Sequence, residues 1–120
     1  MRETGKEYEN IASHYLEKNG YKIITTNFNT KIGEIDIIAK DGKTLVFVEV
    51  KARKKSSYQP YEAVNKSKTD KIIKSSLIYI KKNGIKDLDL RYDVVSIKGT
   101  VKEPEITLIK NAFNAEKYFI

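Results

Sequence analysis

The chain has 120 residues, of which 40% are hydrophobic and 32% charged. These values are typical of one folded domain spanning residues 1–120 and exclude a disordered chain. With no cysteine and a single histidine, the sequence also excludes disulfides, thiolate metal sites, cysteine nucleophiles and multi-histidine metal sites, which leaves carboxylates, lysines and hydroxyls for chemistry.

The net charge of +7 is unevenly distributed along the chain. Residues 51–82 contain ten basic and two acidic residues, a local charge of +8, whereas the rest of the chain sums to −1. This asymmetry favours a polyanionic partner such as nucleic acid, although a solvated lysine-rich face is the alternative. The polar residues 1–10 and the lack of a long apolar run predict a cytoplasmic protein with no membrane contact.

The hydrophobic pattern predicts two helices and five strands. A helix is expected over 4–19, with Glu9 at the edge of its apolar stripe, then a strand over 21–28. Strands over 33–39 and 44–51 form a hairpin around Asp41-Gly42, and a basic loop covers 52–61. A helix capped by Ser67 runs to residue 82, and strands follow over 88–97 and 105–110. Three strands before a helical crossover indicate an α+β fold, a mixed sheet flanked by helices.

The second predicted helix is amphipathic. Its apolar face is expected to consist of Ile72, Ile73, Leu77 and Ile80, with lysines opposite. Ile78 interrupts the cationic face, and helical periodicity does not explain it. In the strand that follows, Arg91 and Asp93 are expected to form an internal ion pair that supports the sheet.

The predicted hairpin carries a group of charged residues. With Asp41-Gly42 at the centre of the turn, Asp36 lies opposite Phe47 and Glu34 opposite Glu49. Alternation then places Glu34, Asp36, Glu49 and Lys51 on one face, and Ile35, Ile37, Val46, Val48 and Val50 on the other.

Acidic side chains that share a small patch raise one another's pKa values or bind a cation. Oxygen ligands without histidine or cysteine favour Mg²⁺ or Mn²⁺, and Glu9 from the first helix could complete a ligand set of Glu9, Glu34, Asp36 and Glu49. Lys51, on the same face, could orient a water or stabilise a phosphate oxygen. This equipment suits phosphodiester hydrolysis. The alternative is that Glu34 forms ordinary surface ion pairs with Lys51 or Arg53 on an edge hairpin.

Several motifs give this pattern a specific resemblance. Gly33-Glu-Ile-Asp-Ile-Ile-Ala39 and Leu45-Val-Phe-Val-Glu-Val-Lys-Ala-Arg53, with Arg91-Tyr-Asp-Val-Val95, closely resemble the YraN-like family of small bacterial endonuclease-related proteins. That family belongs to the PD-(D/E)XK nuclease superfamily. The resemblance implies a restriction-endonuclease-like α-β-β-β-α-β core, with Asp36, Glu49 and Lys51 as the catalytic acid, acid and lysine and Glu9 as the helix-borne acid. The wider superfamily makes branched DNA a substrate by analogy.

The leading hypothesis is therefore a Mg²⁺- or Mn²⁺-dependent nuclease that binds nucleic acid, by preference DNA, through its basic segment. The residues expected to contact it are Arg53, Lys54, Lys55, Tyr58, Lys66, Lys68, Lys71 and Lys74. Two alternatives stay open: a non-catalytic nucleic-acid-binding protein with the nuclease fold, and a subunit that is active only in a protein complex. The sequence does not distinguish DNA from RNA, nor a monomer from a homodimer.

Overall fold

The structure, a computed structural model, describes residues 5–53 and 66–115. In chain order it contains α1 (Gly5–Lys18), β1 (Tyr21–Asn29), β2 (Glu34–Asp41), β3 (Thr44–Arg53), α2 (Lys66–Lys82), β4 (Asp89–Gly99) and β5 (Pro104–Phe113). The predicted element order and the α+β class are confirmed, consistent with a restriction-endonuclease-like core. Within these two stretches, no helix has the length and apolar character needed to cross a membrane.

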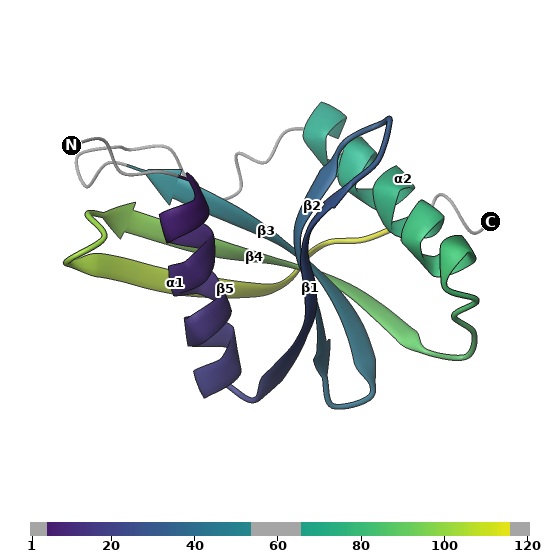
Figure 1. Cartoon of the computed structure of the whole chain (residues 1–120), viewed down its shortest axis with the longest axis horizontal. Helices are drawn as coiled ribbons and strands as arrows, with labels where there is room; N and C mark the ends of the chain where they lie inside the picture. Colours follow the sequence, from purple (N-terminus) through teal and green to yellow (C-terminus); the bar gives the residue numbers. More distant parts are fainter. Residues whose placement is uncertain (1–4, 54–65, 116–120) are drawn as a thin grey trace.

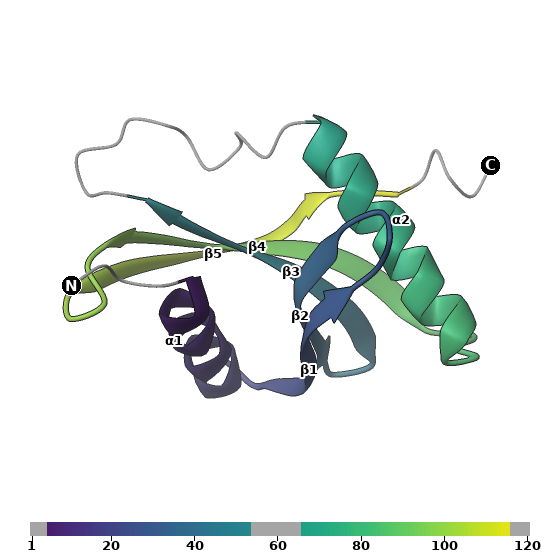
Figure 2. The same cartoon turned by 45° about the horizontal axis from the view of Figure 1, so that its top comes forward.

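The five strands form one mixed sheet in the order β1-β2-β3-β4-β5. Only β3 and β4 are parallel, and α2 supplies the crossover that a parallel pair requires. Figure 2 shows α1 on one side of β3, β4 and β5 and α2 on the other. The β1 and β2 strands twist away from the rest of the sheet, so that their connecting loop reaches α2 (Figure 1).

Each face of the sheet has its own hydrophobic core. The core under α1 is mostly aliphatic, with Leu16 of the helix packed against Ile37, Val46 and Val95 of the strands. The core under α2 combines aliphatic residues with an aromatic group. The rings of Phe47 and Tyr92 stack with centroids 5.5 Å apart, and Tyr79 of α2 meets Phe47 edge to face. Both helices are therefore held by apolar burial on one face each.

The register of the β2–β3 hairpin differs from the prediction by two residues. Asp41 pairs with Thr44 and Ile38 with Phe47, so the turn residues are Gly42 and Lys43, not Asp41 and Gly42. Gly42 has a φ of 63° and holds the first turn position, which glycine favours in type II′ turns. Asp41 remains in the strand because its carboxylate accepts a 2.8 Å hydrogen bond from Arg91. The last pair in this register is Ile37 with Val48. If the register is continued by one more residue, Asp36 lies opposite Glu49.

The buried face of α2 also differs from the apolar stripe that the sequence predicted. Ile72 and Ile73 are buried as expected, but the other buried residues are Ser75, Ser76 and Tyr79, whereas Leu77 and Ile80 are only partly buried. Ser76 explains the rotation, because its hydroxyl donates to the Ile73 carbonyl at 2.6 Å and bonds to the Tyr92 hydroxyl at 2.7 Å. Ser67 lies within the helix and so does not cap it.

Candidate functional site

The alternation of side chains between the two faces of the sheet is interrupted in β2 at Asp36. This interruption determines where the acidic side chains of the hairpin lie. Ile35 was expected on the face of Ile37, but it packs with Ile38 and Phe47 under α2. On the neighbouring strand Asn27 has a φ of 54°, an uncommon left-handed conformation inside a strand. The ladder to β3 ends at Ile37, and the Asp36 carboxylate instead accepts a 2.8 Å hydrogen bond from the Val50 amide. Asp36 therefore lies between β3 and α1.

Three carboxyl groups from two elements meet at this position. Glu9 of α1 and Glu34 and Asp36 of β2 each offer an oxygen, and these oxygens all lie within 4.8 Å of one another. Glu9 also hydrogen-bonds with Asp36 and accepts from the Asn27 amide. We call Glu9, Glu34 and Asp36 the acid cluster. In the part of the chain that the structure describes, no ion pair joins Glu34 to Lys51. The β2 and β3 strands are internal to the sheet, so the expectation that this hairpin lies at an edge is wrong.

Glu49 adjoins the acid cluster from the α2 side. Its side chain, 4% exposed, hydrogen-bonds with Asp36, and its Oε2 lies 3.1 Å from the ammonium nitrogen of Lys68. The Lys68 contact is an ion pair without hydrogen-bond geometry, since Oε2 has no hydrogen-bond partner among the described residues. Asp36 thus connects Glu9 on one side with Glu49 on the other.

Burial and neighbouring carboxylates shift the protonation equilibria of Asp36 and Glu9. Burial, followed by the hydrogen bond and charge of Glu49, raises the pKa of Asp36 to about 8, although the Val50 amide and Lys68 act in the opposite direction. Burial and then the charge of Asp36 also raise the pKa of Glu9. Asp36 therefore retains a proton near neutral pH when nothing else neutralises its carboxylate.

The donor set fits a hard divalent cation. Oxygens bound to one Mg²⁺ at about 2.1 Å lie at most about 4.2 Å apart, so the acid cluster needs to close by less than about 1 Å. A cation held by Glu9, Glu34 and Asp36 would replace the proton that the crowded acids otherwise retain. Lys51 follows Glu49 by two residues on β3 and is half-buried. It thus extends from the same side of the strand as Glu49.

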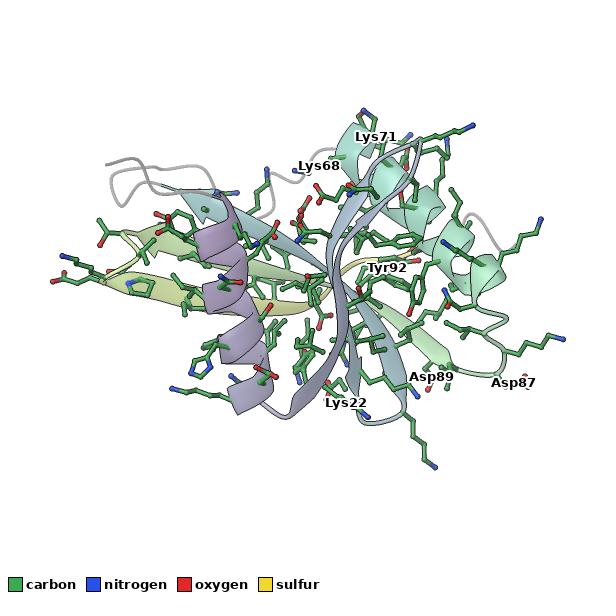
Figure 3. The ribbon with its side chains drawn as sticks, viewed as in Figure 1. Lys22, Lys68, Lys71, Asp87, Asp89 and Tyr92 are labelled. Carbon is green, nitrogen blue, oxygen red and sulfur yellow. The ribbon has the colours of Figure 1, made fainter. Side chains whose placement is uncertain are left out.

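The residues predicted to contact nucleic acid are only partly within the described structure. Lys66, Lys68, Lys71 and Lys74 are exposed on α2, and Figure 3 shows Lys68 and Lys71 at the N-terminal end of that helix. Arg53 is half-buried at the end of β3. Lys54, Lys55 and Tyr58 lie outside the described residues. Lys68 therefore has a contact that the sequence did not indicate, its ion pair with Glu49.

A second polar network lies at the other end of β2. Arg91 bonds to Asp93 through Nε at 2.9 Å, which confirms the predicted ion pair. Its terminal nitrogen also donates to the Tyr21 hydroxyl and to Asp41, each at 2.8 Å. Asp93 is fully buried, and it further accepts from the Tyr21 hydroxyl and the Asn111 amide. This network joins β1, β2, β4 and β5.

Sequence reasoning assigned no role to Asn27. Its amide donates to Glu9, and its left-handed backbone accompanies the break in β2. An asparagine within a strand of Ile, Thr and aromatic residues is the signal that could have indicated it, because asparagine is depleted in strands and tolerates positive φ.

Comparison with known proteins identifies the family of this chain. Residues 8–97 match the uncharacterised protein family UPF0102. A UPF0102 protein of Desulfosudis oleivorans is 45% identical over 112 residues, covering 92% of this chain and 89% of the relative. One from Alkaliphilus metalliredigens is 46% identical over 110 residues, covering 91% and 96%. One from a Sulfurihydrogenibium species is 42% identical over 113 residues, covering 93% and 95%. The chain therefore belongs to family UPF0102, the YraN-like group.

Proposed function

We propose that this protein is a metal-dependent endonuclease that hydrolyses phosphodiester bonds in DNA. The observation that carries the proposal is the convergence of Glu9, Glu34 and Asp36 within 4.8 Å, with Glu49 hydrogen-bonded to Asp36. Carboxylates this close together repel one another, and a divalent cation bound between them would remove that repulsion.

Each residue of the site has a distinct role in this proposal. Glu9, Glu34, Asp36 and Glu49 hold Mg²⁺ or Mn²⁺, which when bound polarises the scissile phosphate and lowers the pKa of a water. Asp36 is fixed by the Val50 amide, so its carboxylate direction is set by the backbone of β3. Lys51 orients the attacking water and stabilises the negative charge that develops on the phosphate oxygens. The water oxygen bonds to phosphorus and releases a proton to the solvent, while the bond to the leaving oxygen breaks and that oxygen takes up a proton from the solvent.

The exposed lysines of α2 supply the affinity for the substrate. Lys66, Lys71 and Lys74 are exposed on the helix whose first turns carry Lys68 beside Glu49. Phosphate contacts of this kind weaken with salt, because each releases counterions on binding. They carry no sequence information, so structure in the DNA, such as a branch, is the expected determinant of specificity.

A cleavage assay tests the proposal. Linear duplex, single-stranded, flapped and four-way-junction DNA, together with RNA, are incubated with Mg²⁺ or Mn²⁺ and three identically purified proteins: wild type, Lys51→Ala and Lys22→Ala. Lys22 is exposed on β1 and lies far from α2's first turns (Figure 3), so its variant controls for loss of one positive charge. We expect Lys51→Ala to lose at least about 100-fold in rate. Lys22→Ala should cleave like wild type.

A second candidate is a nucleic-acid-binding protein that retains the fold without turnover. The ion pair between Lys68 and Glu49 favours it, because Lys68 neutralises this acid without a cation. The same assay separates the two: no cleavage of any substrate, with salt-sensitive binding that persists in EDTA, would replace the nuclease with the binding protein. Equal cleavage by wild type and Lys51→Ala would remove Lys51 from the mechanism.

A further inference from the structure

Two exposed isoleucines line one hollow between the β1–β2 loop and α2. Ile32, in the loop between β1 and β2, is 42% exposed, and Ile78 of α2 is 38% exposed. With Phe28 they form part of the wall of a cavity of about 740 Å³. We call this cavity the Ile32–Ile78 hollow. Its size falls within the range of about 300–1,000 Å³ that is usual for binding pockets. Ile78, which helical periodicity did not explain, therefore lies in the wall of this hollow.

The loop that presents Ile32 is anchored firmly to α2. Thr30 Oγ1 accepts hydrogen bonds from the amides of Ile32 and Gly33, at 3.1 and 3.0 Å, and lies 3.0 Å from the Ser75 hydroxyl of α2. Gly33 packs so closely on the helix that a Cβ there would lie 3.3 Å from Cβ of Lys71. Exposure of Ile32 is therefore a fixed feature of the loop.

The charges around the hollow select an anionic occupant. Lys31 and Lys82 line it, and none of the lining residues that the structure describes is acidic. Lys74 and Lys81 add exposed positive charge on the same helix. The complementary ligand combines negative charge with an apolar face. An unpaired nucleotide has both, whereas the bases of a duplex are stacked and expose only their edges.

The hollow is also close to the acid cluster along the chain. Ile32 precedes Glu34 by two residues, so their Cα atoms are at most about 7 Å apart. One base step along a strand of duplex DNA is about 3.4 Å. A base at Ile32 and a phosphate at the acid cluster can therefore belong to one nucleic-acid strand.

We propose that the Ile32–Ile78 hollow binds an unpaired nucleobase, so that the substrate class is DNA with a single strand beside a duplex. The substrate class for cleavage rests on the proposed nuclease function. Binding of the base in the hollow does not depend on it. Ile32, Ile78 and Phe28 contact the base. Lys31 and Lys82 contact the adjoining phosphates. Apolar residues of this kind often enter nucleic acid where bases are unstacked.

The test is a binding titration in EDTA, where no metal-dependent cleavage occurs. Three labelled ligands are compared: a blunt duplex, the same duplex with a single-stranded tail, and the tailed duplex with abasic sites in place of the tail nucleotides. We expect wild type to bind the normal tail roughly tenfold more tightly than the abasic tail, which carries the same phosphates. Ile32→Ser and Ile78→Ser should each lose most of this preference while binding blunt duplex as before. Ile24→Ser is the matched control, because Ile24 is 43% exposed on β1 and does not line the hollow.

Two results would overturn the proposal. Equal affinity for normal and abasic tails would show that only phosphates are bound, and a preference that survives both Ile32→Ser and Ile78→Ser would place the base elsewhere. A third result would assign the hollow to an acidic protein partner instead. In that case the two tails bind equally, a Glu-Leu copolymer displaces the tailed duplex from wild type, and Ile32→Ser abolishes this displacement. A preference for the normal tail with no cleavage in Mn²⁺ would remove the nuclease and leave the base site intact.

Discussion

Asp36 is the residue on which the geometry of the site depends. Its carboxylate accepts from the Val50 amide and hydrogen-bonds with both Glu9 and Glu49. A proton or a cation bound at Asp36 therefore reduces the repulsion between the surrounding carboxylates in the folded protein. The cost of holding them together is a free-energy penalty of folding, which a neutral side chain at position 36 would relieve.

We predict that Asp36→Asn stabilises the protein in EDTA at pH 7 while it abolishes Mn²⁺ binding. Asparagine retains an acceptor for the Val50 amide but needs no proton to remain neutral, whereas the pKa of Asp36 is raised from 3.8 to about 8. Each tenfold change in proton affinity corresponds to about 1.4 kcal/mol, so a gain of about 2 kcal/mol in the free energy of unfolding is expected.

Urea denaturation measures the change in stability, and calorimetry measures Mn²⁺ affinity. Glu17→Gln, which removes an exposed carboxylate from α1, is the control and should alter neither quantity. If Asp36→Asn lowered the stability in EDTA, the crowding of acids would not be a penalty in the folded state.

At the level of elements, the sheet is held at one end by the network around Arg91. This side chain joins Asp93 of β4 to Tyr21 of β1 and Asp41 of β2, and Asp93 bonds onward to the Asn111 amide of β5. The Asn111 bond lies at an irregularity of the β4–β5 pairing, where Asn111 has a φ of 55°. Asp93 thus fills a gap in the backbone ladder that an apolar residue would leave open.

We predict that Arg91→Met costs about 3 kcal/mol of stability and that Lys110→Met costs less than about 0.5 kcal/mol. Both residues contact the same oxygen of Asp41, but Arg91 also neutralises the buried Asp93, whereas Lys110 is exposed. Urea denaturation of the two variants checks the prediction. Equal losses would mean that Asp41, and not the buried carboxylate, sets the strength of the network.

The elements themselves could be predicted from the sequence, because each has a periodic apolar pattern and punctuating turn residues. The hairpin register could not, since both Asp41-Gly42 and Gly42-Lys43 are acceptable turns, and Arg91, fifty residues away, holds Asp41 in the strand. A slip of two residues preserves side-chain parity, so Ile38 and Phe47 still share a face as expected.

The sequence predicted that the acidic residues lie close together, but it did not predict the interruption of side-chain alternation in β2 that brings them there. The resemblance indicated Glu9 and Asp36, yet strict alternation along β2 would have kept Ile35 under α1. The irregular backbone at Asn27 breaks that alternation, and nothing in the strand pattern specifies where a long-range contact will bend a strand. In the same way, the hydroxyl of Tyr92 draws Ser76 of α2 into the core, where an apolar stripe alone would have placed Leu77.

At the scale of the whole molecule, pH and divalent cations should act on stability together. Between pH 4 and pH 8 the unfolded chain releases the proton of Asp36, whereas the folded protein retains it, since its pKa is about 8 in the fold against an ordinary 3.8. The folded state then binds more protons than the unfolded state, so the contribution of Asp36 to stability falls as pH rises. The raised pKa of Glu9 acts in the same direction. A cation bound by the deprotonated acids reverses this loss, and it binds more tightly at higher pH because it competes with protons.

We therefore predict that Mn²⁺ raises the free energy of unfolding more at pH 8 than at pH 5.5, by roughly 1–2 kcal/mol. The net charge of +7 also changes the self-repulsion of the fold with pH, so each value is taken relative to Asp36→Asn, which shares that background but lacks the titrating carboxyl. Urea denaturation with Mn²⁺ and with EDTA, at both pH values, gives the four free energies for each protein. Asp36→Asn should show little Mn²⁺ effect at either pH. A Mn²⁺ effect that is equal at both pH values in wild type would mean that the cation binds away from the raised carboxyls of Asp36 and Glu9, and the acid cluster would then not be the metal site.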